Sequence, residues 1–412
     1  MKQGWEVKKI QDITKVINGY AFPSKDFEST NSIKSIKSIK ITNVGVKKFV
    51  EEKDNYLPEK YKSTLQDYKV KEGNIVIALT RTIIAAGLKV AVVPYSYDGA
   101  FLNQRVAALI PNEKLINQRY LYNYLTTDDV EKYVLANVNT LMQPNLSIND
   151  LRNLLIPLPP LPEQKRIVAI LDEAFAGINL AVANAEKNLA NARELFESYL
   201  NNVFTQKGDG WEEKLLSSTC IVERGSSPRP IKQFLTDDAD GVNWIKIGDT
   251  KGVVKSIRST KQRITKEGAK RSRAVNPGDF ILTNSMSYGK PYIMETSGCI
   301  HDGWFVLRLA ENINTDFFYY LLSSRLVQDQ FSSLAAGAIV KNISGDLVKK
   351  TLLPIPPVSE QRRLVEAIEK LSSETQHLKN IYEQKLTSLN ELKQSILQQA
   401  FSGKLTSAVD ER

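Results

Sequence analysis

The sequence "PLPPLPEQKRIV", which begins at Pro157, recurs as "PIPPVSEQRRLV" from Pro354, 197 positions further along the chain. In both copies the prolines prevent a helix and favour an extended segment, and a Glu-Gln pair then opens a proline-free stretch. An acidic residue at this place suits the positive end of a helix dipole. A proline-rich ligand or a linker is the alternative interpretation, but repetition between β-rich and helical sequence favours a structural corner. We therefore predict a hinge followed by a long helix at both places.

The duplicated unit is much larger than the hinge. "GWEVKKI" at Gly4 recurs as "GWEEKLL" at Gly210, and "IKITNV" at Ile39 recurs as "IKIGDT" at Ile245, each 206 residues later. Three further pairs are "EGNIVIALT" from Glu72 with "PGDFILTNS" from Pro277, "YLYNYL" from Tyr120 with "FFYYLL" from Phe317, and "NLS" from Asn145 with "NIS" from Asn342. Two copies of one unit thus account for nearly the whole chain, with net deletions in the loops of the second.

Each copy has the same order of expected elements. Short β-rich runs come first, with strands predicted at 74–79, 89–93, 244–248 and 279–283. One short helix follows in each copy, at 117–134 and at 314–331, and the hinge and the long helix come last. The predicted fold class is α/β (α+β) in two copies, related by an internal pseudo-two-fold duplication. The predicted divisions are 1–156, an α/β domain; 157–204, a hinge and central long helix; 205–353, a second α/β domain; and 354–412, a hinge and C-terminal long helix.

The two long helices carry the same apolar stripe. Its members recur in steps of three and four from Ile167 to Val203, and the second stripe keeps the same phase from Leu364 to Ala400, with Lys393 as the clear misfit. Each helix can run for about forty residues, or ~60 Å. Such a stripe favours packing of the two helices against each other as an antiparallel coiled coil, with one α/β domain at each end.

Apolar residues also lie beyond this stripe, at Phe175, Ala183, Ala190 and Leu195. They widen the apolar surface past the needs of a two-stranded coil. We therefore expect helices of another protein to pack here.

Composition narrows the class of protein. With 412 residues, 42% hydrophobic and 25% charged, the chain is typical of a soluble protein of two or three domains. The N-terminus "MKQGWEVKKI" has no apolar stretch after its charges, and no apolar run approaches the length of a membrane span, so we expect a cytoplasmic protein without membrane contact. Cys220 and Cys299 form no CxxC pair and are interpreted as reduced thiols. Two histidines provide little for a zinc site or a catalytic triad.

The net charge of +9 is unevenly distributed. Residues 1–156 hold 22 Lys and Arg against 16 Asp and Glu, and residues 205–353 hold 21 against 16. The helical segments carry no such excess, with 4 against 6 in 157–204 and 8 against 8 in 354–412. This split favours a polyanion at the α/β domains and protein contacts at the helices. A mildly basic surface that binds nothing is the alternative.

Catalytic motifs are missing from the sequence. It contains no Asn-Pro-Pro-Tyr or Asp-Pro-Pro-Tyr for base methylation, no glycine-rich cofactor loop after a first strand and no phosphate-binding GxxxxGK[ST]. His301 is interpreted as an ordinary hydrogen-bonded loop residue. We therefore expect a non-catalytic protein, without a metal site.

The chain resembles the specificity (S) subunit of type I restriction–modification systems over essentially its whole length. The resemblance lies in "IPLPPLPEQKRIVAIL" and "LPIPPVSEQRRLVEAI", in the preceding "NLSINDL" and "NISGDLV", and in "GSSPRPIK…WIKIGD" and "FLNQRVAALIP". It implies that 1–156 and 205–353 are target recognition domains, similar to the DNA-reading domain of adenine-N6 methyltransferases. Each would read one half of a bipartite site in double-stranded DNA, with the helices as a spacer.

The same resemblance implies protein partners. The helices would dock two methyltransferase (M) subunits, to which restriction (R) subunits can add. No cofactor is expected in this chain, whereas S-adenosylmethionine and ATP with Mg²⁺ are expected in the partner subunits. The sequence leaves open whether an R subunit exists and whether the isolated chain self-associates through its helices.

Base-reading candidates lie mainly in loops after equivalent strands, at 80–89 and 283–290. Arg pairs well with guanine and Asn or Gln with adenine, and hydroxyl groups pair with several bases. The candidates are Tyr20, Thr80, Arg81, Thr82, Arg224, Ser226, Ser227, Arg229, Asn284, Ser285, Ser287 and Tyr288. Different residues at equivalent places are what two different half-sites require, although ordinary loop divergence produces the same pattern.

Phosphate-contact candidates are cations near these loops and in the stretch 251–273, which holds nine Lys and Arg and one acid. They are Lys25, Lys89, Lys232, Lys255, Arg258, Lys261, Arg263 and Lys290. A solvated basic face is the alternative for 251–273. For the whole chain, the rival functions are a self-contained methyltransferase or nuclease with an unrecognised site, and a coiled-coil scaffold that binds no DNA.

Overall fold

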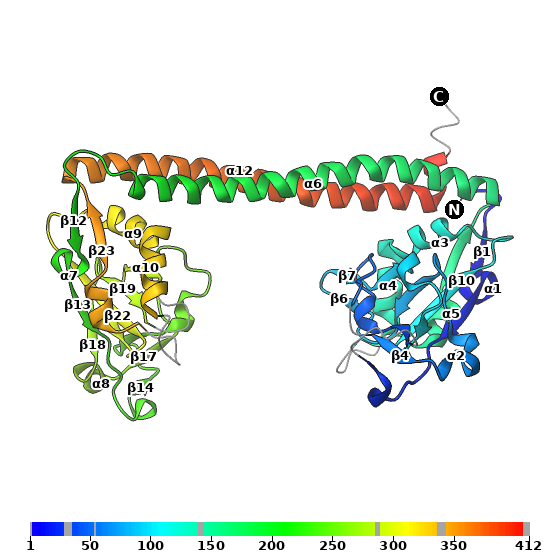
Figure 1. Ribbon diagram of the computed structural model, residues 1–412, viewed down its shortest axis with the longest axis horizontal. Coiled ribbons are helices and arrows are strands. Elements are labelled where there is room, and N and C mark those ends of the chain that lie inside the picture. The colour runs from blue at the N-terminus through cyan, green and yellow to red at the C-terminus, as the bar shows by residue number, and fades with distance from the viewer. Residues whose placement is uncertain are drawn as a thin grey trace. The chain divides into compact units, whose positions relative to one another are not determined.

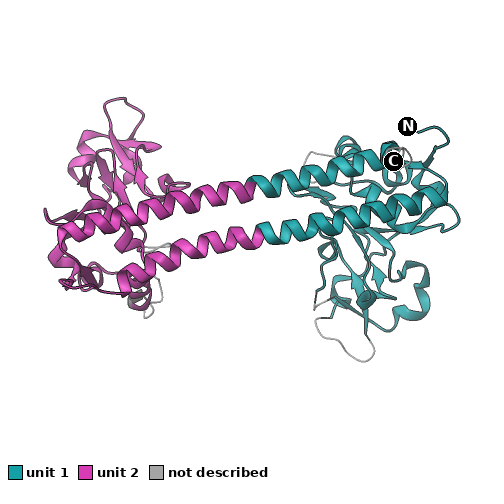
Figure 2. Ribbon diagram, turned by 90° about the horizontal axis from the view of Figure 1, so that it is seen from above, with its two compact units in different colours: residues 1–185, 384–412 teal, residues 186–383 magenta. Residues whose placement is uncertain are grey.

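The computed structural model describes residues 2–28, 35–52, 55–138, 144–284, 289–335 and 343–406. Its internal contacts divide the chain into two compact units (Figure 2). Unit 1 comprises Met1–Ala185 with Gln384–Arg412, and unit 2 comprises Glu186–Glu383. Both long helices therefore contribute one part to each unit. The division of the chain at 156, 204 and 353 follows the order of elements rather than these contacts, and it stays a prediction.

Unit 1 is built around a four-stranded antiparallel sheet of order β2-β10-β5-β8, of which Figure 1 labels β10. A smaller sheet, β4-β3-β9, and the hairpin β6-β7 lie in the same unit. The strands are β1 (Glu6–Lys9), β2 (Thr14–Asn18), β3 (Ser35–Ile39), β4 (Tyr56–Pro58), β5 (Ile75–Ala78), β6 (Ile83–Ile84), β7 (Gly87–Leu88), β8 (Val90–Val92), β9 (Phe101–Leu102), β10 (Val106–Pro111) and β11 (Leu155–Leu158). The helices are α1 (Ile10–Ile13), α2 (Tyr61–Thr64), α3 (Gln118–Leu125), α4 (Asp128–Asn137), α5 (Ile148–Asn153) and part of α6 (Leu161–Thr205).

Unit 2 repeats this plan with a five-stranded sheet of order β13-β22-β19-β20-β16 and a second sheet of order β14-β17-β15-β21-β18. Its strands are β12 (Glu212–Leu215), β13 (Cys220–Arg224), β14 (Leu235–Thr236), β15 (Val242–Ile245), β16 (Ser256–Ile257), β17 (Gln262–Ile264), β18 (Arg273–Val275), β19 (Phe280–Thr283), β20 (Pro291–Met294), β21 (Gly298–Ile300), β22 (Trp304–Leu309) and β23 (Leu352–Ile355). Its helices are α7 (Leu216–Thr219), α8 (Lys266–Lys270), α9 (Thr315–Ser323), α10 (Arg325–Ala335), α11 (Gly345–Lys349) and part of α12 (Val358–Ser402). The predicted fold class and internal duplication are confirmed.

Alternating side chains of the central strands fill two cores. In β5, Ile75 and Ile77 join the cluster that includes residues of α3 and α6, whereas Val76 and Ala78 join the cluster on the other face of the sheet. In β19, Phe280 and Ile281 divide between two clusters in the same way. Because successive side chains of a strand point to opposite faces, a fully apolar run is buried on both sides. The central strands are thus packed between two hydrophobic clusters in each unit.

The start of the proline-rich hinge is extended, as predicted, and it belongs to a strand that pairs with the first strand of its own unit. β11 is antiparallel to β1, with Ile156 opposite Lys8, and β23 is antiparallel to β12, with Leu353 opposite Lys214. Helix α6 begins at Leu161 and α12 begins at Val358, two residues before the Glu-Gln pair of each copy. The pairing of the hinge strand therefore joins the first and the last strand of each unit.

The glutamine of the repeated motif explains why the motif occurs twice. Gln164 is fully buried; its Oε1 accepts from the backbone N–H of Asn117 at 2.7 Å, and its Nε2 donates to the carbonyls of Pro159 at 2.8 Å and Leu115 at 3.0 Å. This one amide satisfies three backbone groups where the hinge, the long helix and the segment before α3 meet. Unpaired groups at a buried corner would be costly, so the corner depends on this residue type.

The long helices lie side by side and antiparallel within each unit (Figures 1 and 2). In unit 1 the beginning of α6 shares a hydrophobic cluster with the end of α12, through Ile167, Leu171, Leu397 and Phe401. In unit 2 the end of α6 shares a cluster with the beginning of α12, through Leu200, Phe204, Val365 and Ile368. The predicted antiparallel pairing is confirmed, and each helix is 45 residues long.

Lys393, the misfit of the predicted stripe, is accommodated by an aromatic ring. Its Nζ lies 4.8 Å from the ring centre of Phe175 on α6. Burial, with a smaller contribution from the positive charge of Lys47, lowers the pKa of Lys393. A cation over an aromatic face regains part of the lost hydration, so the lysine is tolerated in the helix pair.

The prediction of one short helix in each copy is wrong, because two helices occupy each of these segments. Helix α3 ends at Leu125, and Thr127 then caps α4 by accepting from the backbone N–H of Val130. Ser324 separates α9 from α10 at the equivalent place. A hydroxyl side chain can bond to the free backbone N–H groups at a helix start. At Thr127 this cap begins a new helix, although the apolar pattern continues through it.

Helix α6 is more apolar than the sequence prediction allowed. By length and composition it could cross a membrane, with an 18-residue window of mean hydropathy 1.5. The buried residues Ile167, Leu171, Ile178 and Ala185 lie along one stripe of this helix. A core helix of a soluble protein passes the same test, so this finding is weak evidence for a membrane span.

Candidate nucleic-acid interface

In unit 1 the predicted base-reading residues gather at one edge of the central sheet. The ends of β2 and β5 and the beginnings of β10 and β8 meet there, because neighbouring strands are antiparallel. The loops that leave this edge carry Tyr20, Thr80, Arg81, Thr82 and Lys89. We call this set of loop residues the unit 1 edge; residues 103–105, which precede β10, also belong to it.

Backbone hydrogen bonds hold these loops together. The N–H of Tyr20 donates to Leu102 at 2.8 Å, and the N–H of Gln104 donates back to Tyr20 at 2.9 Å. The N–H of Leu79 donates to the carbonyl of Arg105 at 2.9 Å. The three loops therefore present their side chains from a fixed backbone.

The segment 144–146 holds the loop after β5 from the other side. The N–H of Thr82 donates to Pro144 at 3.0 Å, and the N–H of Arg81 donates to the side chain of Asn145 at 3.3 Å. Arg81 has a φ of +48° and an exposed side chain. A left-handed backbone is uncommon for arginine, and such strain is found most often where a side chain must be directed for function.

Two of the unit 1 candidates already form hydrogen bonds within the protein. Thr82 is fully buried, and its hydroxyl accepts from the N–H of Leu146 at 3.3 Å. Lys89 is half-buried and donates to the carbonyl of Ile41 at 3.0 Å; burial, together with the charge of Arg81, lowers its pKa. These contacts give both residues a structural role, whereas Arg81 projects from the loop. Lys25 is exposed in the segment that follows Tyr20.

In unit 2 the same sheet edge exists, formed by the ends of β13 and β19 and the beginnings of β22 and β20. It carries six of the predicted residues in the described chain: Arg224, Ser226, Ser227, Arg229, Asn284 and Lys290. Ser285, Ser287 and Tyr288 were also predicted, and they lie outside the described residues. We call this set, with residues 301–303 before β22, the unit 2 edge.

Asp302 is the centre of the unit 2 edge. Its carbonyl accepts from Asn284 Nδ2 at 2.7 Å and from Arg224 Nε at 3.3 Å. Its carboxylate accepts from the hydroxyl of Ser227 at 2.7 Å and lies 3.7 Å from the guanidinium of Arg229. The Ser227 hydrogen bond is the largest of the contacts that keep the pKa of Asp302 below its usual range, so this carboxylate is ionised at neutral pH.

The basic stretch 251–273 lies mainly on the second sheet of unit 2. Lys232, Lys261 and Arg263 have exposed side chains, and Arg263 also donates to a backbone carbonyl at 3.3 Å. Arg258 pairs with Glu295 at 2.6 Å. These cations, with Lys290, stay candidates for phosphate contact.

Lys255 is placed differently from the other cations of this stretch. Its Nζ lies 2.6 Å from Asp316 of α9 and 3.6 Å from Glu369 of α12. Burial opposes its charge, but the hydrogen bond to Asp316 and the nearby carboxylates leave its pKa raised. Lys255 thus links a loop to two helices within unit 2.

Sequence reasoning missed Asp302, its counterpart Gln104 in unit 1, and Arg105, which corresponds to Gly303. The signal was present in the quoted segment "FLNQRVAALIP", because its residues "NQR" precede β10 as "HDG" at 301–303 precedes β22. Because "NQR" and "HDG" have no residue in common, sequence comparison alone does not extend the repeat across them.

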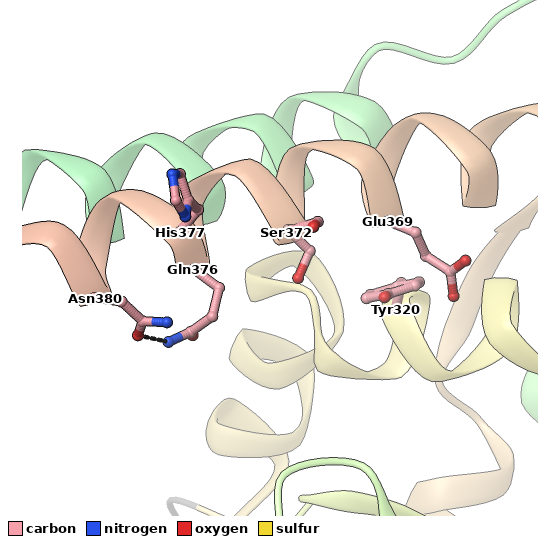
Figure 3. A pocket seen from close by; sticks show the side chains of 7 residues that line it. Tyr320, Glu369, Ser372, Gln376, His377 and Asn380 are labelled. Atoms are coloured by element: carbon pink, nitrogen blue, oxygen red, sulfur yellow. Dashed lines mark hydrogen bonds between the residues drawn. The ribbon is translucent and has the colours of Figure 1, made fainter.

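A polar groove of about 520 Å³ also lies in unit 2, between α9 and α12 (Figure 3). Its lining residues are Tyr320, Glu369, Ser372, Ser373, Gln376, His377 and Asn380. Gln376 donates to Asn380 at 2.9 Å, and His377 points away from Tyr320 (Figure 3). Across the described ranges, no group of three His, Cys, Asp or Glu residues could hold a metal ion. Among the described residues no hydrogen bond joins Glu369, His377 and the two serines of this groove, so the sheet edges are the better candidates for function.

The fold and these edges define a class of protein: a duplicated, two-edge binding protein whose equivalent loops offer different polar side chains on the same backbone frame. Residues 2–188 and 208–387 each match the type I restriction modification DNA specificity domain. The chain therefore belongs to that family.

Several curated proteins are similar to this chain. The chain is 24% identical to the type I restriction enzyme EcoBI specificity subunit of Escherichia coli, over 98% of this chain and 86% of that one. It is 31% identical to the MjaVIII specificity subunit of Methanocaldococcus jannaschii, over 40% of this chain and 37% of that one, so this match spans well under half of that relative.

Solved structures show the same fold. A structure described under complex assembly and conformational transition of the type I R-M system has a TM-score of 0.79 at 20% identity, covering 98% of this chain and 99% of the other. The HsdS subunit of Thermoanaerobacter tengcongensis has a TM-score of 0.56 at 20% identity, covering 98% of both chains. The predicted family is confirmed.

Proposed function

We propose that this chain is the DNA-specificity subunit of a type I restriction–modification complex, in which the unit 1 edge and the unit 2 edge each contact one half of a bipartite site in double-stranded DNA. One observation carries this proposal. The same sheet edge is built twice, with several equivalent backbone hydrogen bonds and different exposed polar side chains, in a member of a DNA specificity family. A reader of two different half-sites needs such a constant frame with variable side chains.

Charge supports contact with a polyanion at these edges. Arg81 and Arg105 are exposed at the unit 1 edge, and Arg229 and Lys290 are exposed at or beside the unit 2 edge. The positive excess of the chain lies in the same α/β segments. Cations near the loops would contact phosphates and fix the register, while neighbouring polar groups contact base edges.

The long helices are the proposed docking surface for two M subunits. Leu180 is 65% exposed on α6 in unit 1, and Leu195 is 51% exposed on α6 in unit 2. Leu392 of α12 is 48% exposed. Large exposed side chains on paired helices favour a protein partner. R subunits would then join through the M subunits, and the isolated chain could cover the same residues by self-association.

The chemistry would reside in those partners. The M subunits would bind S-adenosylmethionine and methylate adenine, and the R subunits would use ATP with Mg²⁺, while this chain performs no catalysis. The complex would act in the cytoplasm.

A selection experiment tests DNA reading. The purified full chain is incubated with a randomised duplex library, and the bound fraction is sequenced. We expect two short conserved half-sites at a fixed spacing. The affinity for the selected duplex should fall by orders of magnitude between roughly 50 and 200 mM salt, because several phosphate contacts release counterions. Recovery of no common sequence, or salt-insensitive binding, would favour the scaffold function instead.

A second experiment separates the subunit from a self-contained enzyme. The full chain is incubated alone with the selected duplex and S-adenosylmethionine, and separately with Mg²⁺. We expect neither methylated nor cleaved DNA. Methyl transfer or strand cleavage by the chain alone would overturn the non-catalytic assignment.

A further inference from the structure

Asp302 is an acidic residue at an edge where the chain gathers cations. Four residues fix its position: its backbone carbonyl is bound by Arg224 and Asn284, and its carboxylate by Ser227, with Arg229 close by. The side chain is nevertheless about half exposed, at 48%. An ionised carboxylate is thus held rigidly and presented to solvent on a surface suited to DNA.

Gln104 occupies the equivalent place in unit 1. The N–H of Leu79 donates to Arg105, and the N–H of Asn284 donates to Gly303, at 2.9 and 3.1 Å. On the strand side, Gly19 donates to Val106 as Gly225 donates to Trp304, at 3.1 and 2.8 Å. These equivalent hydrogen bonds make residue 104 the structural counterpart of residue 302. The unit 1 edge therefore presents an amide where the unit 2 edge presents a carboxylate.

A carboxylate at this place restricts what it can contact. When ionised it only accepts hydrogen bonds, and it repels phosphate oxygens. Among base edges in the major groove, the donors are the exocyclic amino groups of cytosine and adenine, and acidic side chains pair with cytosine N4. The oxygen that faces Arg229 lies 3.7 Å from the guanidinium, beyond hydrogen-bond length, so it remains able to accept.

We propose that Asp302 determines base specificity, by accepting a hydrogen bond from the exocyclic amino group of a cytosine or adenine in the half-site contacted by unit 2. Gln104 holds the same place in unit 1, where its amide both donates and accepts and therefore fits adenine. This inference rests on the proposed function. It goes further by assigning one residue in each unit to a base of stated chemistry.

The competing role for Asp302 is to anchor the segment 226–229 through Ser227. Asp302→Asn separates the two roles, because the asparagine oxygen still accepts from the Ser227 hydroxyl while the amide NH2, a hydrogen-bond donor, replaces the oxygen that would accept from the base. Glu212→Gln is the matched control: Glu212 is an exposed acid of unit 2 on β12, which precedes the opposite end of β13.

The test repeats the duplex selection with the full-length wild-type chain, D302N and E212Q. We expect D302N to lose about 5- to 150-fold of discrimination at one position of one half-site, the range for a single base contact. The other half-site and the spacing should be unchanged, and E212Q should match the wild type. A cytosine or an adenine at the affected position of the wild-type site identifies which amino group is bound.

A chemical change in the DNA gives a second readout with the wild-type chain. In the selected duplex, each cytosine of the half-site assigned to unit 2 is replaced in turn by 2-pyrimidinone, and each adenine by purine, which removes only the amino group. The wild type should lose affinity by a similar factor, and D302N should be insensitive to the replacement.

The outcomes separate the two levels of the proposal. A wild-type chain that selects no bipartite site contradicts the proposed function. A wild-type chain that selects one, with D302N discrimination unchanged or no amino group of that half-site required, contradicts only the role of Asp302. If D302N fails to fold, the amino-group replacement with the wild type still decides, and a lower melting temperature with unchanged base preference indicates the anchoring role.

Discussion

In unit 1 the buried amide of Gln164 joins the start of the long helix to Asn117, and in unit 2 Gln361 joins it to Asn314 with bonds of 2.7 and 2.8 Å. Both glutamines also donate to the proline carbonyl five residues earlier. The two corners thus keep the same side-chain contacts. The two sheet edges, in contrast, share several backbone hydrogen bonds but carry different side chains. Divergence between the copies has therefore kept the corners that position the edges and changed the groups that the edges present.

The contact between the short and long helices shows how a difference can leave the frame intact. In unit 1 Arg119 of α3 pairs with Asp172 of α6 at 2.8 Å. The equivalent residues in unit 2, 197 positions later, are Asp316 and Glu369, which are both acidic. Lys255 lies between them, so the attraction is preserved with three residues instead of two.

The largest effect should come from breaking a corner. Gln361→Met keeps the volume but leaves the N–H of Asn314 and the carbonyls of Pro356 and Asn312 without this partner. We expect the free energy of unfolding to fall by about 2–5 kcal/mol, because each buried unpaired group costs about 1–3 kcal/mol. Chemical denaturation measures this loss.

Gln164→Met is the matched variant in unit 1, and its loss should be similar. Unequal losses, with one near zero, would show that the two corners are not equivalent.

A substitution beneath one edge should have the next largest effect. A Cβ atom at Gly225 would lie 2.1 Å from the carbonyl oxygen of His301, so Gly225→Ala must displace the backbone of the unit 2 edge. We expect a destabilisation of about 1–3 kcal/mol and loss of sequence preference in one half-site only. Binding selection and thermal melting measure these effects.

Gly177→Ala serves as the control for that substitution. No atom lies within 4 Å of a Cβ at this position in α6. We expect a slight gain in stability, up to about 1 kcal/mol, from the better helix propensity of alanine. Equal damage by both alanines would mean that the close approach at Gly225 is unimportant.

Removing Lys255 tests the replacement of one ion pair by another. Lys255→Met leaves Asp316 and Glu369 without their shared cation, and we expect a loss of about 1 kcal/mol, moderated by solvent screening. The slope of DNA affinity against salt should not change, because this ammonium is engaged within the protein. A slope lower by about one unit would instead make Lys255 a phosphate contact.

The smallest effect concerns the helix pair. Lys393→Met removes a half-buried cation from beside Phe175 and Lys47, and the new side chain can pack on the same ring. We expect a stabilisation of about 0.5–1 kcal/mol. The reason is that the cost of burying the charge, which methionine removes, exceeds the cation–π attraction that is lost. A destabilised variant in thermal melting would show that the attraction dominates.

The sequence predicted the frame well, because the frame depends on repeated and periodic patterns. The proline-rich hinge, the stripe from Ile167 to Val203 and the apolar strands such as Ile75–Ala78 each carry a strong local signal. The break at Thr127 was missed, because a hydroxyl cap within an apolar pattern is a weaker signal than the pattern itself.

The candidate edges could be predicted only in part. The loops after β5 and β19 were located correctly relative to the strands, but the burial of Thr82 depends on the distant segment 144–146. Asp302 was missed because its importance arises from four contacts far apart in the sequence. Such convergence becomes visible only once the strands are placed side by side.

The most direct test of the account exchanges one recognition segment and leaves the other alone. Residues 1–156 are replaced by the corresponding segment of another family member with a different site, and the sequence selected by the full chimaera is compared with that of the wild type. The account predicts that one half-site changes to that of the donor, while the other half-site is unchanged. A change in both half-sites, or in neither, would contradict the assignment of one half-site to each edge.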